Sequence, residues 1–163
     1  MKSKNNKPNI LEHEWTILCT GSSVDEQSSL ISLFNLVENI NVSIVLDENQ
    51  KYIKNEKGWY AVPFSLQLVS KLVKRDLCLD LNFDFKYQIF DPNGKQIGKE
   101  FGSNVKFAKG LDSLRLRNQI VDFPITQDGW YKIVLHIKNS EDAQYTKLGH
   151  TSVKINIELK EMA

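Results

Sequence analysis

The feature that most constrains the fold is the alternation of apolar and polar residues in LDLNFDFKYQIF, residues 79–90. A period of two places the apolar side chains on one face of a β-strand and Asp80, Asn82 and Asp84 on the other. DPNG follows at residues 91–94, where Pro presets φ and Asn-Gly accepts a positive φ. The segment therefore predicts a strand and a hairpin turn, with KQIGKEF as the second arm.

The same period recurs along most of the chain. Residues 30–46 are apolar and β-branched, and they fit one long bulged strand, two strands, or a strand and a helical turn. Residues 61–75 fit a strand or a helix, and Pro63 favours the strand. Further strands are predicted at 13–20, 114–125, 129–138 and 152–160, a polar loop at 47–58, and a hairpin loop at 101–110.

Seven to nine strands separated by turns predict an all-β fold, an antiparallel two-sheet sandwich. A length of 163 residues corresponds to one domain. We expect residues 1–9 to form a disordered tail and residues 10–163 to form a single domain.

The acids of residues 79–90 raise the question of a site. A strand with one wet face must place polar residues at alternate positions, and neighbouring strands offer Arg and Lys for cross-strand pairs. Asp80, Asn82 and Asp84 therefore favour a solvated face over a calcium or catalytic site.

Charge and hydropathy exclude several classes of function. Lys and Arg number 21 and Asp and Glu number 20, so the net charge of +1 does not indicate a nucleic-acid partner. The apolar runs are far shorter than the roughly 20 residues that a membrane-spanning helix needs. The N-terminal segment lacks an apolar stretch, so we expect no secretory signal and a cytoplasmic location.

No catalytic or metal-binding motif is visible. Cys19 and Cys78 lack CxxC spacing and are expected to be reduced thiols, Cys19 in the core beside Trp15 and Ile17. No Walker, GxGxxG or GxSxG motif occurs, and we assign no catalytic residue, metal or cofactor. The histidines, His13, His136 and His150, lack metal-ligand spacing, and the loop acids are scattered at Asp25, Asp47, Asp91, Asp112 and Asp128.

A tyrosine opens the predicted strand at residues 129–138. Tyr131 follows Gly129 in a position that resembles the tyrosine corner of immunoglobulin-like sandwiches, where the hydroxyl bonds the backbone a few residues upstream. Ile133 stands where an antibody domain has its second cysteine. The chain thus resembles an immunoglobulin-like sandwich in general plan, without the antibody disulfide.

Several short motifs also resemble an uncharacterised family of small bacterial β-sandwich proteins with no assigned activity. The resemblance implies the fold and carries over no functional residue. The matching positions are Cys19, Asp25, Ser32 to Asn35, Pro63-Phe64, Asp91 to Lys95, and Gly129 to Tyr131.

The functional prediction rests mainly on the absence of catalytic, metal-binding and phosphate-binding motifs. We expect a non-enzymatic binding or assembly module with a protein partner, in which an exposed strand edge could pair two copies into a homodimer. Two alternatives stay open: a hydrolase assembled from Cys19, His136 or His150 with a loop Asp, and a calcium- or carbohydrate-binding sandwich. Trp59 and Trp130, each in a GWY triplet, could stack on a sugar or a protein, although we favour a role in covering the core.

Overall fold

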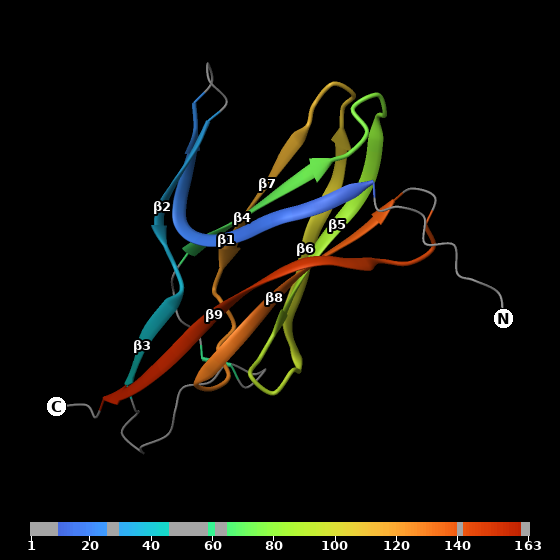
Figure 1. Ribbon diagram of the computed structural model, residues 1–163. Coiled ribbons are helices and arrows are strands. Elements are labelled where there is room, and N and C mark those ends of the chain that lie inside the picture. Colours follow the sequence, from blue (N-terminus) through green and yellow to red (C-terminus); the bar gives the residue numbers. More distant parts are fainter. Residues whose placement is uncertain (1–9, 26–29, 46–58, 61–64, 140–141, 161–163) are drawn as a thin grey trace.

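The computed structural model describes residues 10–25, 30–45, 59–60, 65–139 and 142–160. Within these residues the chain forms two β-sheets and no helix (Figure 1). The described part therefore holds no helix long and apolar enough to cross a membrane. Its strands are β1 (Leu11–Val24), β2 (Ile31–Leu36), β3 (Asn39–Val45), β4 (Ser65–Lys74), β5 (Leu81–Phe90), β6 (Gln96–Phe107), β7 (Ser113–Val121), β8 (Gly129–Asn139) and β9 (Thr146–Lys160).

The two sheets, here called sheet A and sheet B, have the strand orders β2-β1-β4-β7 and β3-β9-β8-β5-β6. Sheet A is antiparallel throughout, but β3 runs parallel to β9 in sheet B. The expectation of purely antiparallel sheets is therefore wrong for this pair. The reason is the short crossing at Val37 and Glu38, which carries the chain from sheet A into sheet B without reversing it. Val37 N donates to Leu18 O at 2.8 Å, and Lys154 N donates to Glu38 O at 2.9 Å.

The strand positions test the sequence predictions element by element. Residues 30–46 contain two strands, one in each sheet, and residues 65–74 are a strand, as favoured. The predicted loop at 101–110 is wrong, because β6 continues to Phe107 and pairs with β5. Phe107 is fully buried and Phe101 packs against the core, so burial of these rings extends the strand. The predicted tail at 1–9, the loop at 47–58, Asp47 and Pro63-Phe64 lie outside the described residues.

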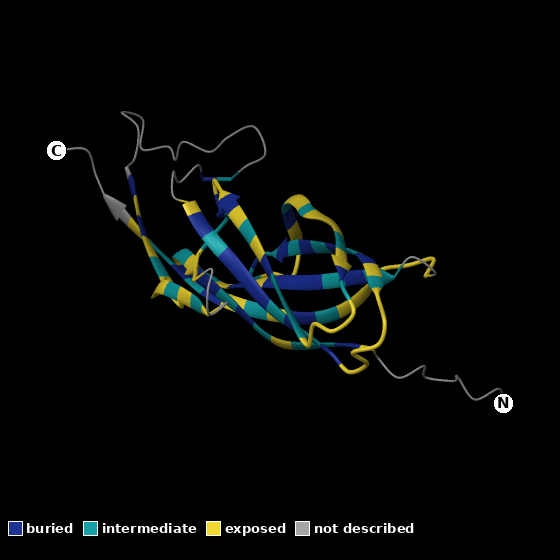
Figure 2. Ribbon diagram, turned by 90° about the horizontal axis from the view of Figure 1, so that it is seen from above, coloured by how far each residue is buried: buried dark blue, intermediate teal, exposed yellow. Residues whose placement is uncertain are grey.

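The core lies between the two sheets. Along β5 the side chains of Phe83, Phe85, Tyr87 and Ile89 are buried, as the alternation predicted. Figure 2 shows the same pattern as buried segments along the strands, with exposed residues gathered at the turns. The aliphatic side chains of β4, β8 and β9 close this core from the other strands.

β1 departs from the predicted facing. Its pairing with β4 shifts register between His13 and Trp15, which marks a β-bulge. Thr16 is therefore buried, whereas Trp15 and Ile17, expected in the core, are only half-buried. A bulge adds one residue to one strand, so the side chains directly beyond it change face, whereas Cys19 further along is buried as expected.

Candidate functional site

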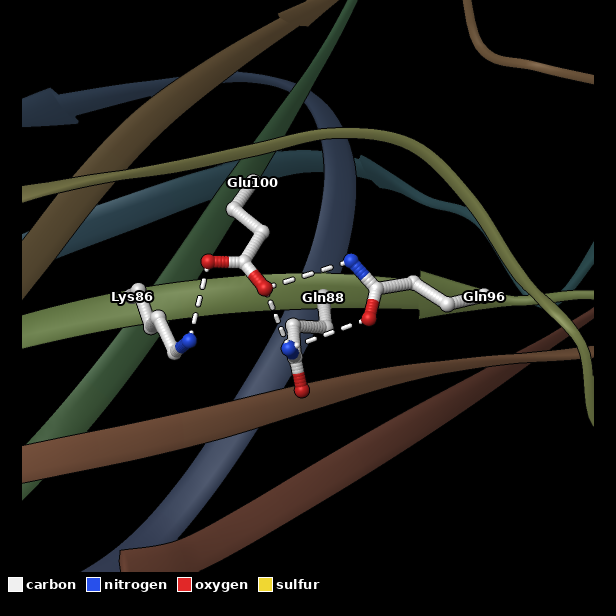
Figure 3. Close-up of polar contacts among 4 residues, drawn as sticks. All are labelled: Lys86, Gln88, Gln96 and Glu100. Atoms are coloured by element: carbon white, nitrogen blue, oxygen red, sulfur yellow. Dashed lines mark hydrogen bonds and ion pairs between the residues drawn. The ribbon is translucent and has the colours of Figure 1, made fainter. Parts of the chain in front are cut away.

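The outer face of sheet B carries a polar network around Glu100. The Lys86 ammonium donates to one carboxylate oxygen at 2.8 Å, and the side-chain amides of Gln88 and Gln96 donate to the other (Figure 3). The hydrogen bond from Lys86 and that from Gln88 hold the pKa of Glu100 down at about 2. The charge of Glu100 is thus already neutralised by its own neighbours.

The acids of residues 79–90 are engaged in the same way. Asp84 accepts from the Asn104 amide at 2.9 Å and pairs with Lys138 at 3.4 Å, and these contacts lower its pKa. Asp80 accepts from the backbone N–H of Lys109 at 2.8 Å, which lowers its pKa and fixes the loop after β6. Each of these carboxylates therefore already accepts hydrogen bonds from protein groups, and no three of the described acids form a group that could hold a calcium ion.

Cys19, the nucleophile of the hydrolase alternative, lies in an unreactive setting. Cys19 is fully buried, its thiol faces the carbonyl oxygen of Gln67 at 3.6 Å, and burial raises its pKa. A reactive cysteine requires the opposite shift. Burial also lowers the pKa of all three histidines, His13, His136 and His150.

Two of the loop acids, Asp91 and Asp128, serve the fold. Asp91 is buried and accepts from the backbone N–H groups of Asn93 and Lys95, both at 2.9 Å, which closes the DPNG turn. Asp128 accepts from Ile157 N of β9. No three His, Cys, Asp or Glu side chains of the described ranges form a group that could hold a metal ion.

The tyrosine corner predicted at Tyr131 is present, and it decides how β8 begins. The buried hydroxyl donates to Gln127 O at 2.7 Å and accepts from the N–H groups of Thr126 and Gln127. Gly129 has a φ of 129°, and a Cβ there would lie 2.9 Å from the Pro92 ring, so glycine lets the DPNG turn pack on the strand. With Tyr131 fixed inward, the preceding side chain, Trp130, must point outward.

Trp130 is therefore an exposed aromatic, with 59% of its surface accessible. The expected role in covering the core is wrong for Trp130, while Trp59 does pack against the core. The sequence signal that could have separated the two is the alternation itself, because Trp130 precedes a tyrosine that faces inward.

A first hollow of about 540 Å³ lies on one side of Trp130, where β1 and the crossing between the sheets approach β9. Its lining mixes aliphatic side chains with hydroxyl and amide groups. The lining residues are Thr16, Ile17, Leu18, Leu36, Val37, Glu38, Asn39, Trp130, Thr151 and Ser152.

A second hollow of about 440 Å³ lies on the outer face of sheet B, next to the DPNG turn. Trp130 and Ser152 line both hollows, so the indole stands between them. The remaining lining residues of the second hollow are Phe90, Asp91, Pro92, Gly94, Tyr131, Lys132 and Val134. An exposed aromatic ring between two mixed concavities is an arrangement that suits ligand binding.

No protein-family model and no curated protein matches the sequence. Similar folds occur within solved structures of larger proteins. A beta-glucosidase from Listeria innocua in complex with glucose is 9% identical with a TM-score of 0.44, covering 86% of this chain and 16% of that chain. The alkylpurine DNA glycosylase AlkC of Pseudomonas fluorescens is 12% identical with a TM-score of 0.43, and the match covers 90% of this chain and 30% of that chain.

The C-terminal domain of wzt is 15% identical with a TM-score of 0.37, covering 61% of this chain and 62% of that domain. The chain spans only a small part of the first two proteins. With TM-scores below 0.5, these likenesses carry no argument about function.

Proposed function

We propose that this chain is a non-enzymatic binding module that holds a carbohydrate on the indole of Trp130. The observation that carries the proposal is the position of this exposed ring between two hollows. A sugar ring has an apolar C–H face and a polar rim. The indole offers a flat apolar surface for the first, and the surrounding hydroxyl and amide groups offer partners for the second.

The lining of the hollows suits hydroxyl groups. Asn39, Thr151 and Ser152 contribute small neutral donors and acceptors around the first hollow, and Ser152 belongs to the second as well. Such groups can serve a ligand hydroxyl as donor or acceptor without the desolvation cost of a buried charge. We also propose that the fold follows the immunoglobulin-like plan expected from the sequence. The ligand would then bind on a sheet face beside the turns.

The energy scale favours an extended ligand. Covering the exposed part of the indole removes on the order of 100 Å² of apolar surface from water, which contributes about 2–3 kcal/mol. A millimolar dissociation constant corresponds to a binding free energy of about 4 kcal/mol. Contact of a single sugar ring with the indole alone therefore gives only weak binding. A chain of several sugar units that reaches both hollows gains the additional contacts.

The test is affinity electrophoresis of the purified protein in native gels that contain dissolved polysaccharides. We expect one polysaccharide class to retard the wild type, and Trp130→Ala to lose most of the retardation while its melting temperature stays unchanged. Tyr145→Ala is the matched control, because it removes another exposed aromatic ring that lines neither hollow.

A wild type retarded by no polysaccharide class would overturn the proposal. Retention of binding by Trp130→Ala would do the same. The protein partner favoured by the sequence is a separate outcome: a single purified protein that binds the wild type but not Trp130→Ala would replace the carbohydrate as the occupant of this surface.

A further inference from the structure

The face of sheet B around Trp130 is cationic. In the antiparallel register of β8 and β9, Trp130 lies opposite Lys154, and Lys132 lies opposite Ser152. His150 lies opposite Val134 on the same face. Directly paired residues of neighbouring strands project to one side of a sheet, so Lys132 and Lys154 lie on the same face as the exposed indole and close to it, with His150 further along that face.

These cations differ from two other lysines on the same sheet. Lys86 pairs with Glu100 at 2.8 Å and Lys138 pairs with Asp84 at 3.4 Å. Within the described part of the chain, Lys132 and Lys154 form no ion pair with a carboxylate. Lys99, Lys106 and Lys147 of the same sheet likewise have no ion pair with a described carboxylate, and what sets Lys132 and Lys154 apart is their place beside the exposed indole.

The electrostatic environment of His150 agrees with this. Burial lowers the pKa of His150 first, and the positive charges of Lys132 and Lys147 lower it further, with no carboxylate contributing. Lys132 and Lys147 are thus the charged groups that act on His150 on this side of the sheet.

The nearest acids of the two hollows form no ion pair with these lysines in the described part of the chain. The Asp91 carboxylate is buried and already accepts two backbone N–H groups of its own turn. Glu38 belongs to the crossing segment and lines only the first hollow, whereas Lys132 lines the second. Lys154 stands opposite Asn39 on β3, on the side of the first hollow, and Lys132 lines the second hollow, so a ligand that lies across Trp130 passes a lysine on each side.

We infer that the carbohydrate held on Trp130 is an acidic glycan, whose carboxylate or sulfate groups lie over Lys132 and Lys154. This inference rests on the proposed function. It adds the charge of the ligand, because cations without an internal partner contribute to binding through an anion that the ligand supplies. Single-stranded nucleic acid shares the anionic character, but its binding sites use longer basic grooves and successive stacking aromatics. Trp130 is the one aromatic ring exposed at these two hollows among the described residues.

The test compares polygalacturonate with the same polymer after reduction of its carboxyl groups, alongside alginate, hyaluronan, heparin and an oligo-dT strand. We expect an acidic polymer to retard the protein and its uncharged counterpart to bind about tenfold more weakly. Raising the salt from low to high concentration should weaken the acidic complex several-fold, because exposed charges are screened over about 10 Å at 0.1 M salt.

The diagnostic variant is Lys132→Gln with Lys154→Gln, and the charge-matched control is Lys99→Gln with Lys106→Gln on β6. We expect the first pair to weaken binding about tenfold and the control to bind like the wild type. Lys132→Gln alone keeps the test valid if the double variant fails to fold, since Lys132 is exposed.

Three outcomes would overturn the inference. If the carboxyl-reduced polymer binds as tightly as the acidic polymer, and Trp130→Ala loses that binding, the ligand need not be acidic and the proposed function stands. Absence of binding to every polymer would remove both. Tighter binding of oligo-dT than of any glycan would reassign the surface to nucleic acid.

Discussion

The hydroxyl oxygen atoms of Thr16 and Ser70 lie 2.6 Å apart in the protein core. The Thr16 hydroxyl also lies 2.7 Å from His13 Nε2, and the Ser70 hydroxyl lies 2.6 Å from the Tyr87 hydroxyl. The four side chains form one polar chain that runs from β1 through β4 in sheet A to β5 in sheet B. The hydrogen bond between Ser70 and Tyr87 therefore joins the two sheets by a polar contact as well as by apolar packing.

Ser70→Ala should lower the free energy of unfolding by about 1–3 kcal/mol, because it leaves the buried hydroxyls of Thr16 and Tyr87 without their shared partner. Urea denaturation measures the change. Ser22→Ala is the matched control, since Ser22 donates to the Gln67 side chain at 2.7 Å in a partly exposed place and should cost much less. A loss for Ser70→Ala no larger than that of the control would contradict this account of the core.

The same chain predicts how stability depends on pH. When His13 is neutral and Nε2 accepts, Tyr87 donates to Ser70, Ser70 to Thr16 and Thr16 to His13, so every hydroxyl proton has an acceptor. Protonated His13 must donate instead and reverses the chain. The Tyr87 proton then lacks an acceptor among the described residues, and burial, which also raises the pKa of Tyr87, makes that costly.

The sign of the pH effect follows from His13, whose pKa is lowered by burial first and by His150 second. The unfolded chain then binds the proton more tightly, so stability is full above the ordinary pKa of 6.5 and falls as the pH drops toward the folded value. We expect the melting temperature to fall by about 2–4 °C for each 1 kcal/mol lost between pH 7.5 and pH 5.

His13→Gln provides the control for this pH window. It should lose less stability than the wild type over the same interval, although His136 and His150 titrate with the same sign. The pKa of Glu100 is about 2, so its titration lies below the window. An equal loss in His13→Gln and wild type would show that His13 is not responsible.

The tyrosine corner gives a third prediction. Tyr131→Phe keeps the ring, which packs edge-on against Phe123 at 5.8 Å between ring centroids, but removes the acceptor of two N–H groups and a donor to Gln127 O. Unfolding free energy should fall by about 1–3 kcal/mol in chemical denaturation. Because Trp130 is aimed by this residue, glycan retardation should weaken in the same variant. Full binding with reduced stability would separate the corner from the candidate site.

Short sequence patterns correctly predicted the structural elements that depend only on neighbouring residues. The alternation of residues 79–90 gave β5 and its buried face, DPNG gave the turn, and Gly129 with Tyr131 gave the corner. Each depends on a few neighbouring residues whose conformations are restricted in the same way in any β-protein.

Non-local features were not predictable in the same manner. The parallel pairing of β3 with β9 depends on residues more than 100 positions apart, and the bulge after His13 reversed the facing of Thr16 and Trp15. The candidate site could not be predicted for the same reason. Trp130, Ser152 and the crossing segment line one hollow only after the two sheets have assembled. The two GWY triplets are alike in sequence, yet Trp59 is half-buried and Trp130 is exposed.

The last prediction concerns the close approach of β5 and β6. A Cβ on Gly102 would clash with the carbonyl oxygen of Phe85 and lie 2.7 Å from the Cα of Lys86, and backbone atoms in a ladder cannot move aside singly. Gly102→Ala should therefore force the strands apart and lower the free energy of unfolding by roughly 3 kcal/mol.

Gly94→Ala is the matched control for Gly102→Ala. Nothing lies within 4 Å of a Cβ at Gly94, so only its φ of 78° opposes the change, at about 1–2 kcal/mol. Chemical denaturation of both variants compares the two causes. Separation of β5 from β6 would also pull Glu100 away from Lys86, so the carboxyl group of Glu100 should titrate closer to 4.5 in Gly102→Ala than in the wild type. A smaller loss for Gly102→Ala than for Gly94→Ala would mean that the ladder yields and that backbone conformation, not contact, requires glycine in this hairpin.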